Sequence, residues 1–299
     1  MEKTKSLSEE GMQNLILDLR GNPGGYLHIA NQICDEFLKK DELIVFTEGS
    51  KRNKRENFAT DYGLYESLNV IVLINEGSAS ASEIVAGALQ DNDRGLIIGR
   101  RSFGKGLVQE QITLNDGSAI RLTTQRYFTP SGRCIQKNYG KNNKEYFMEQ
   151  YYRYDSITNV QDSTKYTTKN GRIVFGGGGI TPDIVIKQDT NVNYLFINKI
   201  IGKGWLNQFC LEKSEFLKNK NLSSYSKINT EVIYTSFIKY LKQEKNTFEA
   251  LGNTEKKYLK NLLIATISKT LFGNDVYYKK LSEEDEYIQR AIKEFKNFN

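Results

Sequence analysis

The chain has 299 residues, of which 38% are hydrophobic and 26% are charged. This composition is typical of a soluble, folded protein with room for one large domain and a smaller one. The net charge of +6 is uneven, because residues 191–299 hold 18 Lys/Arg and 12 Asp/Glu, which leaves 24 of each for residues 1–190. No run of about 18 apolar residues occurs, which excludes a membrane-spanning helix.

The first hundred residues alternate between the patterns of strands and helices. Apolar runs predict buried strands at 14–20, 42–47, 69–75 and 94–100. The spacing of apolar residues predicts a helix over 26–39, and residues 77–92 indicate a loop that continues into a helix. This alternation favours an α/β core.

The pattern changes after residue 107. Asn115-Asp116-Gly117 lies between two strand-like runs and predicts a β-hairpin. Residues 132–172 are polar and rich in Tyr, which indicates an excursion on the surface. GGGG at 176–179 and the following ITPDIVI indicate a turn and a closing strand.

Beyond residue 190 the sequence has the spacing of helices, most clearly at 231–243, 254–270 and 274–298. We therefore expect a domain boundary near residue 190. The aromatic residues of this part fit a helix-packing role: Trp205, Phe209, Phe216, Tyr234 and Phe237. We expect these helices to pack on the core or to contact a second subunit, which would make a homo-oligomer.

Metal and cofactor chemistry finds little support in the sequence. Cys34, Cys134 and Cys210 lie far apart and form no CxxC pair, which argues against a disulfide framework and a zinc site. No cofactor is expected. The single histidine, His28, lies on the apolar face of a predicted helix and favours a structural role.

Three serines alternate with small residues in GSASASE, at positions 77–83. They lie between a buried strand and a helix, where free backbone amides point outward at the positive end of the helix dipole. A serine in this loop can attack a carbonyl while a neighbouring amide stabilises the oxyanion. Equally, Ser80 or Ser82 can simply cap the helix.

A serine nucleophile needs a base, and lysine replaces histidine in this role where burial favours the neutral amine. Lys105 lies between Gly104 and Gly106, just after the strand expected at 94–100. Small neighbours allow close packing of the backbone around such a lysine. On its own, a lysine between glycines is usually a turn residue in solvent.

Taken together, these segments resemble the carboxyl-terminal processing (tail-specific) serine protease family. The resemblance rests on five segments in the same order: LDLRGNPGG at 17–25, residues 75–92, FGKGLVQ at 103–109, residues 114–133 and GGGGITPDI at 176–184. It covers roughly residues 10–190 and implies a crotonase/ClpP-like spiral α/β core with added β-hairpins. Residues 1–190 would then be a serine protease core, and residues 191–299 a helical C-terminal domain.

The resemblance assigns roles residue by residue. Ser80 matches the family nucleophile, Lys105 the general base and Gln109 the glutamine that holds the lysine in position. The remaining matches concern the oxyanion hole, for which Ala81 supplies one amide and Gly24 or Gly25 the other. Asp91 matches an acidic position sometimes implicated in activity, and a solvent-exposed acid at a helix end is the alternative interpretation.

The implied activity is that of an endopeptidase that cleaves polypeptides near their C-termini through an acyl-enzyme. The polypeptide substrate would bind as an extended strand against the sheet. Members of the family usually carry an export signal and a PDZ domain before the core. Neither precedes residue 15, and the N-terminal segment has no apolar stretch like that of a signal peptide.

The chain is therefore expected to be a truncated catalytic core without its PDZ domain. The full-length protein is expected outside the cytoplasm, in the periplasm or anchored to a membrane, and a cytoplasmic protein is the alternative.

Three other functions remain as alternatives. The chain could be an inactive scaffold or regulator of the same fold, or a crotonase-like acyl-CoA enzyme, which uses oxyanion-hole amides without a serine–lysine pair. The basic C-terminal third could also bind nucleic acid. Its lysines are scattered between acidic residues, however, so a solvated helical surface is favoured and no nucleic-acid partner is expected.

Overall fold

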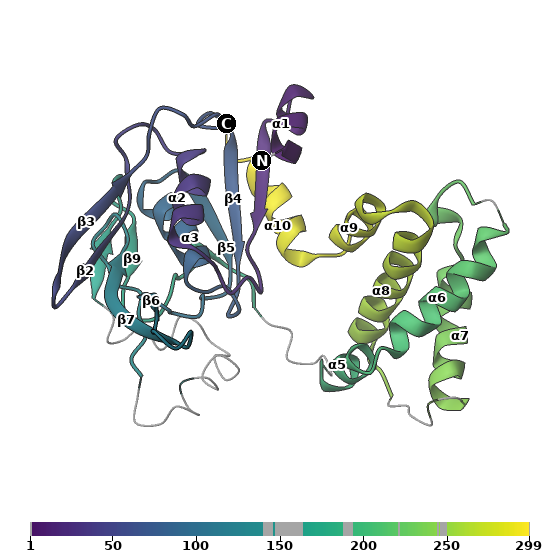
Figure 1. The fold of residues 1–299 in the computed structure, drawn as a ribbon. Coiled ribbons are helices and arrows are strands. Elements are labelled where there is room, and N and C mark those ends of the chain that lie inside the picture. The colour runs from purple at the N-terminus through teal and green to yellow at the C-terminus, as the bar shows by residue number, and fades with distance from the viewer. Residues whose placement is uncertain are drawn as a thin grey trace. The chain divides into compact units, whose positions relative to one another are not determined.

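The computed structural model describes residues 2–139, 146, 164–187, 194–220, 222–243, 245 and 250–298 (Figure 1). The chain divides into two compact units. The first comprises Met1–Lys187 with Ala291–Asn299, and the second comprises Gln188–Arg290. The break after Lys187 lies next to the boundary expected near residue 190, but the C-terminal residues return to the first unit.

The core of the first unit is a parallel sheet of four strands. Its order is β1-β4-β5-β10, formed by β1 (Asn14–Asp18), β4 (Asn69–Ile74), β5 (Gly95–Gly99) and β10 (Ile184–Val185). The side chains of β4 from Val70 to Ile74 are fully buried. This agrees with the continuous apolar run, which is typical of a central strand covered on both faces.

Two helices fill the space beside this sheet. These are α2 (Leu27–Asp35) and α3 (Ala81–Asp91), which pack against each other, and every residue of α3 is buried. Helix α3 contacts β5 of the parallel sheet and β2 of a second sheet (Figure 1). The first residue of α3 follows Ser80 directly, so the packing of α3 fixes the position of the serine loop. A short α1 (Glu2–Glu9) precedes β1.

The second sheet is antiparallel, in the order β3-β2-β7-β6. It contains β2 (Leu43–Gly49), β3 (Arg52–Phe58), β6 (Leu107–Thr113) and β7 (Ala119–Phe128). The predicted hairpin is confirmed, since β6 and β7 pair along their length around the Asn115–Gly117 turn. The sequence did not predict β3, because its residues RNKRENF are nearly all exposed and show no apolar alternation. Charged side chains on such an edge strand discourage pairing with other chains.

Beyond the hairpin, the first unit has only short elements in its described part. Strands β8 (Lys165–Thr167) and β9 (Ile173–Phe175) pair with each other. Most of the surface excursion expected over 132–172 lies outside the described residues. The mixed α/β architecture predicted for this unit is confirmed, as is the helical character of the C-terminal region.

The second unit is built from helices around its own core. Its elements are α5 (Tyr194–Gly202), α6 (Trp205–Lys218), the short 3-10 helix η1 (Tyr225–Lys227), α7 (Thr230–Gln243), α8 (Asn253–Phe272) and α9 (Asn274–Ser282), and α10 (Glu286–Phe295) runs from this unit into the first. The rings of Phe209 and Phe237 lie 5.0 Å apart in its core. Phe216, in contrast, is 63% exposed, so it does not pack within this core.

The helix expected over 274–298 is two helices, α9 and α10. Asp285 explains the break, because its Oδ1 accepts hydrogen bonds from the backbone N–H groups of Tyr287 and Ile288, at 2.9 and 3.2 Å. An aspartate in this position caps the start of a new helix. In the described part of the chain, no helix has the length and apolar character needed to cross a membrane.

The three cysteines are free thiols in different environments. Cys34 and Cys210 are fully buried, and burial raises the pKa of the Cys210 thiol to about 12 and raises that of Cys34 further. Cys134 is half-buried. In the native protein at neutral pH, iodoacetamide should therefore alkylate Cys134 first and leave the other two unmodified, because the thiolate is the reactive form. Mass spectrometry measures the three rates, and equal rates for all three would contradict this; guanidinium should expose all three.

Candidate active site

Ser80 occupies a sharp turn between β4 and α3. Its backbone angles are φ 56° and ψ −118°, a region that residues with a side chain rarely adopt. Such a turn from strand to helix is the conformation that presents the nucleophilic serine in α/β-hydrolases. Ser80 is half-buried, whereas Ser78 and Ser82 are buried.

The two neighbouring serines are occupied by structural hydrogen bonds. Ser78 Oγ donates to the backbone oxygen of Leu19 at 2.7 Å, and Ser82 Oγ donates to that of Asn22 at 3.0 Å. The second bond ties the serine loop to the GNPGG loop, and the first ties it to the segment just before that loop. This arrangement favours Ser80 as the serine available for chemistry.

The GNPGG loop lies directly against the Ser80 turn. Gly24 has φ +90°, and a Cβ atom there would lie 2.6 Å from the nitrogen of Ala81 and 2.4 Å from the oxygen of Ala79. Only glycine fits this position. The loop therefore brings its backbone to the amide of Ala81, the residue expected to contribute to an oxyanion hole.

The amides expected to form that hole differ in their availability. Ala81 is the first residue of α3, so its N–H has no acceptor within the helix. The N–H of Gly24 donates to Asn22 Oδ1 at 2.9 Å. The N–H of Gly25 makes no hydrogen bond with any described residue, which favours Gly25 over Gly24 as the second donor.

Lys105 lies in a loop that follows β5 and packs tightly on both sides. A Cβ atom at Gly106 would lie 2.8 Å from the nitrogen of Gln136, and one at Gly104, which has φ +92°, would lie 3.1 Å from the nitrogen of Gly179. Both glycines are therefore required for the close approach of the backbone. Lys105 is half-buried, and its ammonium group makes no hydrogen bond or ion pair with the described residues.

Glu83 joins the serine turn to the lysine loop. Its Oε2 accepts hydrogen bonds from the backbone N–H groups of Ser80 (2.9 Å) and Lys105 (2.8 Å). Its Oε1 accepts from Gly104 N (2.7 Å) and from Ser102 Oγ (2.5 Å). The side chain is completely buried, and burial raises the pKa of this carboxyl, against the effect of the four hydrogen bonds.

The sequence interpretation did not single out Glu83. A serine followed three residues later by glutamate is the pattern of a capping box, and this pattern was the available signal.

Tyr127 makes a second link between the same two segments. Its hydroxyl lies 3.1 Å from the backbone oxygen of Ser80 and also bonds to that of Lys105. Burial, and after it the charge of Glu83, raises the pKa of Tyr127 well above its usual value, so the phenol stays protonated and can donate. Ser80 and Lys105 are therefore held next to each other through both their N–H and their C=O groups.

Gln109 does not take the position expected for it. It lies on β6 opposite Thr123, immediately after a shift of register between Val108 and Gln109, and its side chain is exposed. It makes no hydrogen bond with Lys105 in the structure.

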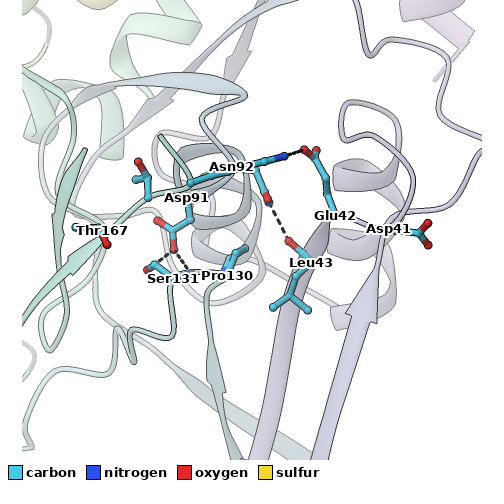
Figure 2. A pocket seen from close by; sticks show the side chains of 10 residues that line it. Asp41, Glu42, Leu43, Asp91, Asn92, Pro130, Ser131 and Thr167 are labelled. Atoms are coloured by element: carbon cyan, nitrogen blue, oxygen red, sulfur yellow. Dashed lines mark hydrogen bonds and ion pairs between the residues drawn. The ribbon is translucent and has the colours of Figure 1, made fainter. Parts of the chain in front are cut away.

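Asp91 lies at the other end of α3, about 15 Å of helix away from Ser80. Its carboxylate is buried, pairs with Arg133 Nη2 at 2.7 Å and accepts from Ser131 N (3.1 Å) and Ser131 Oγ (2.7 Å). Figure 2 shows it beside Ser131, at a polar pocket of about 490 Å³. The interpretation of Asp91 as a solvent-exposed acid is wrong, because its charge is neutralised inside the protein. These contacts support a structural role.

Neither a histidine base nor a metal centre is found at this site. His28 is exposed on α2, where its ring lies 5.5 Å from that of Tyr26. Within the described ranges, no group of three or more His, Cys, Asp or Glu residues is arranged to hold a metal ion. The described residues bring together here the Ser80 turn, the Lys105 loop and the side chains of Glu83 and Tyr127.

Comparison with known proteins gives a consistent set of relatives. Residues 1–146 match the family model described as peptidase family S41. The carboxy-terminal-processing protease of Bartonella bacilliformis is 39% identical over 215 residues, which is 72% of this chain and 40% of that protein. The carboxyl-terminal-processing protease of Synechocystis sp. is 42% identical over 131 residues, 44% of this chain and 30% of that protein. The chain thus spans less than half the length of these relatives.

Among solved structures, that of a photosystem II D1 C-terminal processing protease is similar, with 28% sequence identity and a TM-score of 0.45. The match covers 62% of this chain and 38% of that structure.

Proposed function

The chain belongs to the carboxy-terminal-processing proteases of peptidase family S41, and we propose that it is a serine endopeptidase that uses Ser80 as nucleophile and Lys105 as general base. One observation carries the assignment: a single oxygen of Glu83 accepts hydrogen bonds from the backbone of both residues. The serine turn and the lysine loop, 25 residues apart in sequence, are thereby held side by side.

The proposed reaction proceeds in two steps. A neutral Lys105 amine removes the proton of Ser80 as Oγ attacks the peptide carbonyl, and the amide N–H groups of Ala81 and Gly25 stabilise the oxyanion. The C–N bond then breaks, and the leaving amine takes the proton from Lys105. Lys105 next removes a proton from a water molecule, which attacks the ester carbonyl. The C–O bond to Ser80 then breaks, Ser80 Oγ takes the proton back from Lys105, and the second product leaves with its new carboxyl group.

The exposed edge of β6 fits a polypeptide substrate. This strand begins two residues after Lys105 and is the last strand of its sheet, so one row of its backbone groups has no neighbouring strand in the described structure. An extended substrate can pair with such an edge and bring its carbonyl towards the nucleophile. Gln109 lies exposed on this strand, along the proposed substrate path.

The cellular location, further domains and oligomeric state of the full-length protein are part of the same proposal. The relatives are bacterial and chloroplast processing proteases, and a location outside the cytoplasm is compatible with them. We also propose a PDZ domain in the full-length protein that delivers the substrate C-terminus. Contacts between the C-terminal helices of two copies would make a homo-oligomer.

The proposed function is tested by incubating the chain with an unstructured protein and, separately, with a fluorophosphonate probe. We expect cleavage, and covalent modification of Ser80 located by peptide mapping, because only an activated serine reacts with such a probe. Ser118→Ala, in an exposed turn, is the control and should behave like the wild type. Modification of Ser78 or Ser82 instead would contradict the assignment. If the chain neither cleaves nor reacts, it is an inactive scaffold of the same fold.

A further inference from the structure

The contacts of Glu83 exceed those that its place in α3 requires. A glutamate three residues after an N-cap serine needs only the N–H of that serine to complete a capping box. Here the carboxylate also accepts hydrogen bonds from three donors in the segment 102–105, which is 19 to 22 residues further along the chain. Capping therefore explains one of its four hydrogen bonds.

We propose that Glu83 is a positioning residue, whose carboxylate fixes the distance and orientation between the Ser80 turn and the Lys105 loop. The inference deepens the proposed function and rests on it for its catalytic consequence, although the structural link is a property of the fold alone. Glu83 does not face the substrate path itself, since its side chain is completely buried.

The donor pattern matches a carboxylate and no neutral side chain of the same shape. Three of the four donors are backbone N–H groups, which cannot reverse their polarity. The fourth is the hydroxyl of Ser102, whose oxygen already accepts the N–H of Ile180 at 2.6 Å. Two acceptor oxygens satisfy all four, whereas glutamine would turn an NH₂ group towards at least one N–H donor.

None of the four partners carries a charge, so the carboxylate is buried without an ion pair. Buried charges are costly when they are not paired, and the raised pKa of Glu83 reflects this cost. A residue that only capped a helix could do so at the surface. The burial is explained if the carboxylate must reach both loops from between them.

Glu83 also determines which amide remains for the oxyanion. The Glu83 carboxylate accepts a hydrogen bond from the backbone N–H of Ser80, and the backbone N–H of Glu83 donates to the backbone oxygen of Ser80 at 2.8 Å. Ala81 N–H, between them in sequence, is left without an acceptor in the helix. The same contacts hold Ser80 in its unusual backbone conformation.

The test compares Glu83→Gln and Glu83→Ala with the wild type in the full chain. We expect kcat for polypeptide cleavage to fall by about 10²-fold in Glu83→Ala, because small displacements of catalytic groups have effects of this size. KM should stay within about threefold, and labelling of Ser80 by the fluorophosphonate should fall in parallel with kcat. The kcat of Glu83→Gln should lie between those of the wild type and Glu83→Ala, since its one remaining oxygen can still accept the N–H groups of Ser80 and Lys105.

Amide hydrogen exchange provides a readout that does not depend on activity. In Glu83→Ala, we expect faster exchange both in residues 78–83 and in residues 102–106, with β4 unchanged. A capping role alone would change only the first of these segments and would overturn the proposal. The isosteric Glu83→Gln keeps this comparison decisive if the alanine variant does not fold.

Glu42→Gln is the control, because Glu42 is a mostly buried carboxylate that accepts the backbone N–H of Lys39, pairs with Lys169 and makes no hydrogen bond to either loop. It should change neither exchange nor kcat. If exchange responds in both segments while the wild type proves inactive, the link stands and the proposed function fails. If the wild type is active and kcat is unchanged in both Glu83 variants, the positioning role fails.

Discussion

Lys105→Met is expected to lower kcat/KM for a polypeptide substrate by about 10³-fold. General bases commonly contribute 10²- to 10⁴-fold, and methionine keeps much of the side-chain length while removing the amine. The backbone bonds of residue 105 to Glu83 and Tyr127 do not involve its side chain, so they should survive the substitution. Circular dichroism should confirm that the variant is folded. Lys105→Arg should not restore activity, because a guanidinium does not release its proton.

A double-mutant comparison makes this prediction specific to a dyad. Ser80→Ala should lower kcat/KM at least as much as Lys105→Met does. The double variant should have the kcat/KM of the more damaging single variant, because the effects of residues that act as a unit are not additive. Lys40→Met is the control, since Lys40 is an exposed residue paired with Asp61 on the surface. Independent, multiplicative losses would mean that Lys105 does not act through Ser80.

Arg133→Met should lower the free energy of unfolding of the first unit by about 3–5 kcal/mol, because it leaves a buried carboxylate unpaired. The side chains of Arg133 and Asp91 are both fully buried and lie 2.7 Å apart. Arg133 also donates to the backbone oxygen of Phe175 at 3.1 Å and to Gln90 Oε1 at 2.6 Å. Burial lowers the pKa of Arg133, and the charge of Asp91 opposes this effect, so each ion depends on the other.

Urea unfolding at neutral pH measures this effect. Arg52→Met is the control, because Arg52 pairs with Glu110 at 3.1 Å on the exposed strands and should contribute no more than about 1 kcal/mol. Asp91→Asn should destabilise the protein in the same way as Arg133→Met. Equal, small effects of Arg133→Met and Arg52→Met would show that the buried pair is not important for stability, and would reopen the question of a role for Asp91 in activity.

The parts of the fold that the sequence predicted are those set by local patterns. The apolar run of β4, the Asn115–Gly117 turn and the serine loop before α3 are each contained in a few adjacent residues. Strand β3 was missed because nearly all its side chains face solvent, so pairing with β2 alone makes it a strand. The break between α9 and α10 depends on the cap of one side chain, Asp285, inside an otherwise helical pattern.

The site shows the same division between local and long-range information. Ser80 and Lys105 lie in short motifs that the sequence displays directly. The role of Glu83 depends on a loop about 20 residues away, and the partner of Asp91 lies 42 residues further on. The resemblance assigned Gln109 a contact with Lys105, but the side chain of Gln109 is exposed, directly after the register shift in β6. Such contacts cannot be inferred from periodicity.

The backbone angle of Ser80 has a consequence for laboratory evolution. A φ of 56° in a residue with a side chain costs roughly 1–3 kcal/mol, and a glycine at the same place would relieve this strain while removing the proposed nucleophile. Selection of this chain for heat resistance alone should therefore enrich Ser80→Gly, whereas selection that also requires cleavage should exclude it. Sequencing codon 80 in the two selected populations would give the frequency of Ser80→Gly in each. The difference between the two frequencies would reflect the stability that the protein loses by keeping a serine in this backbone conformation.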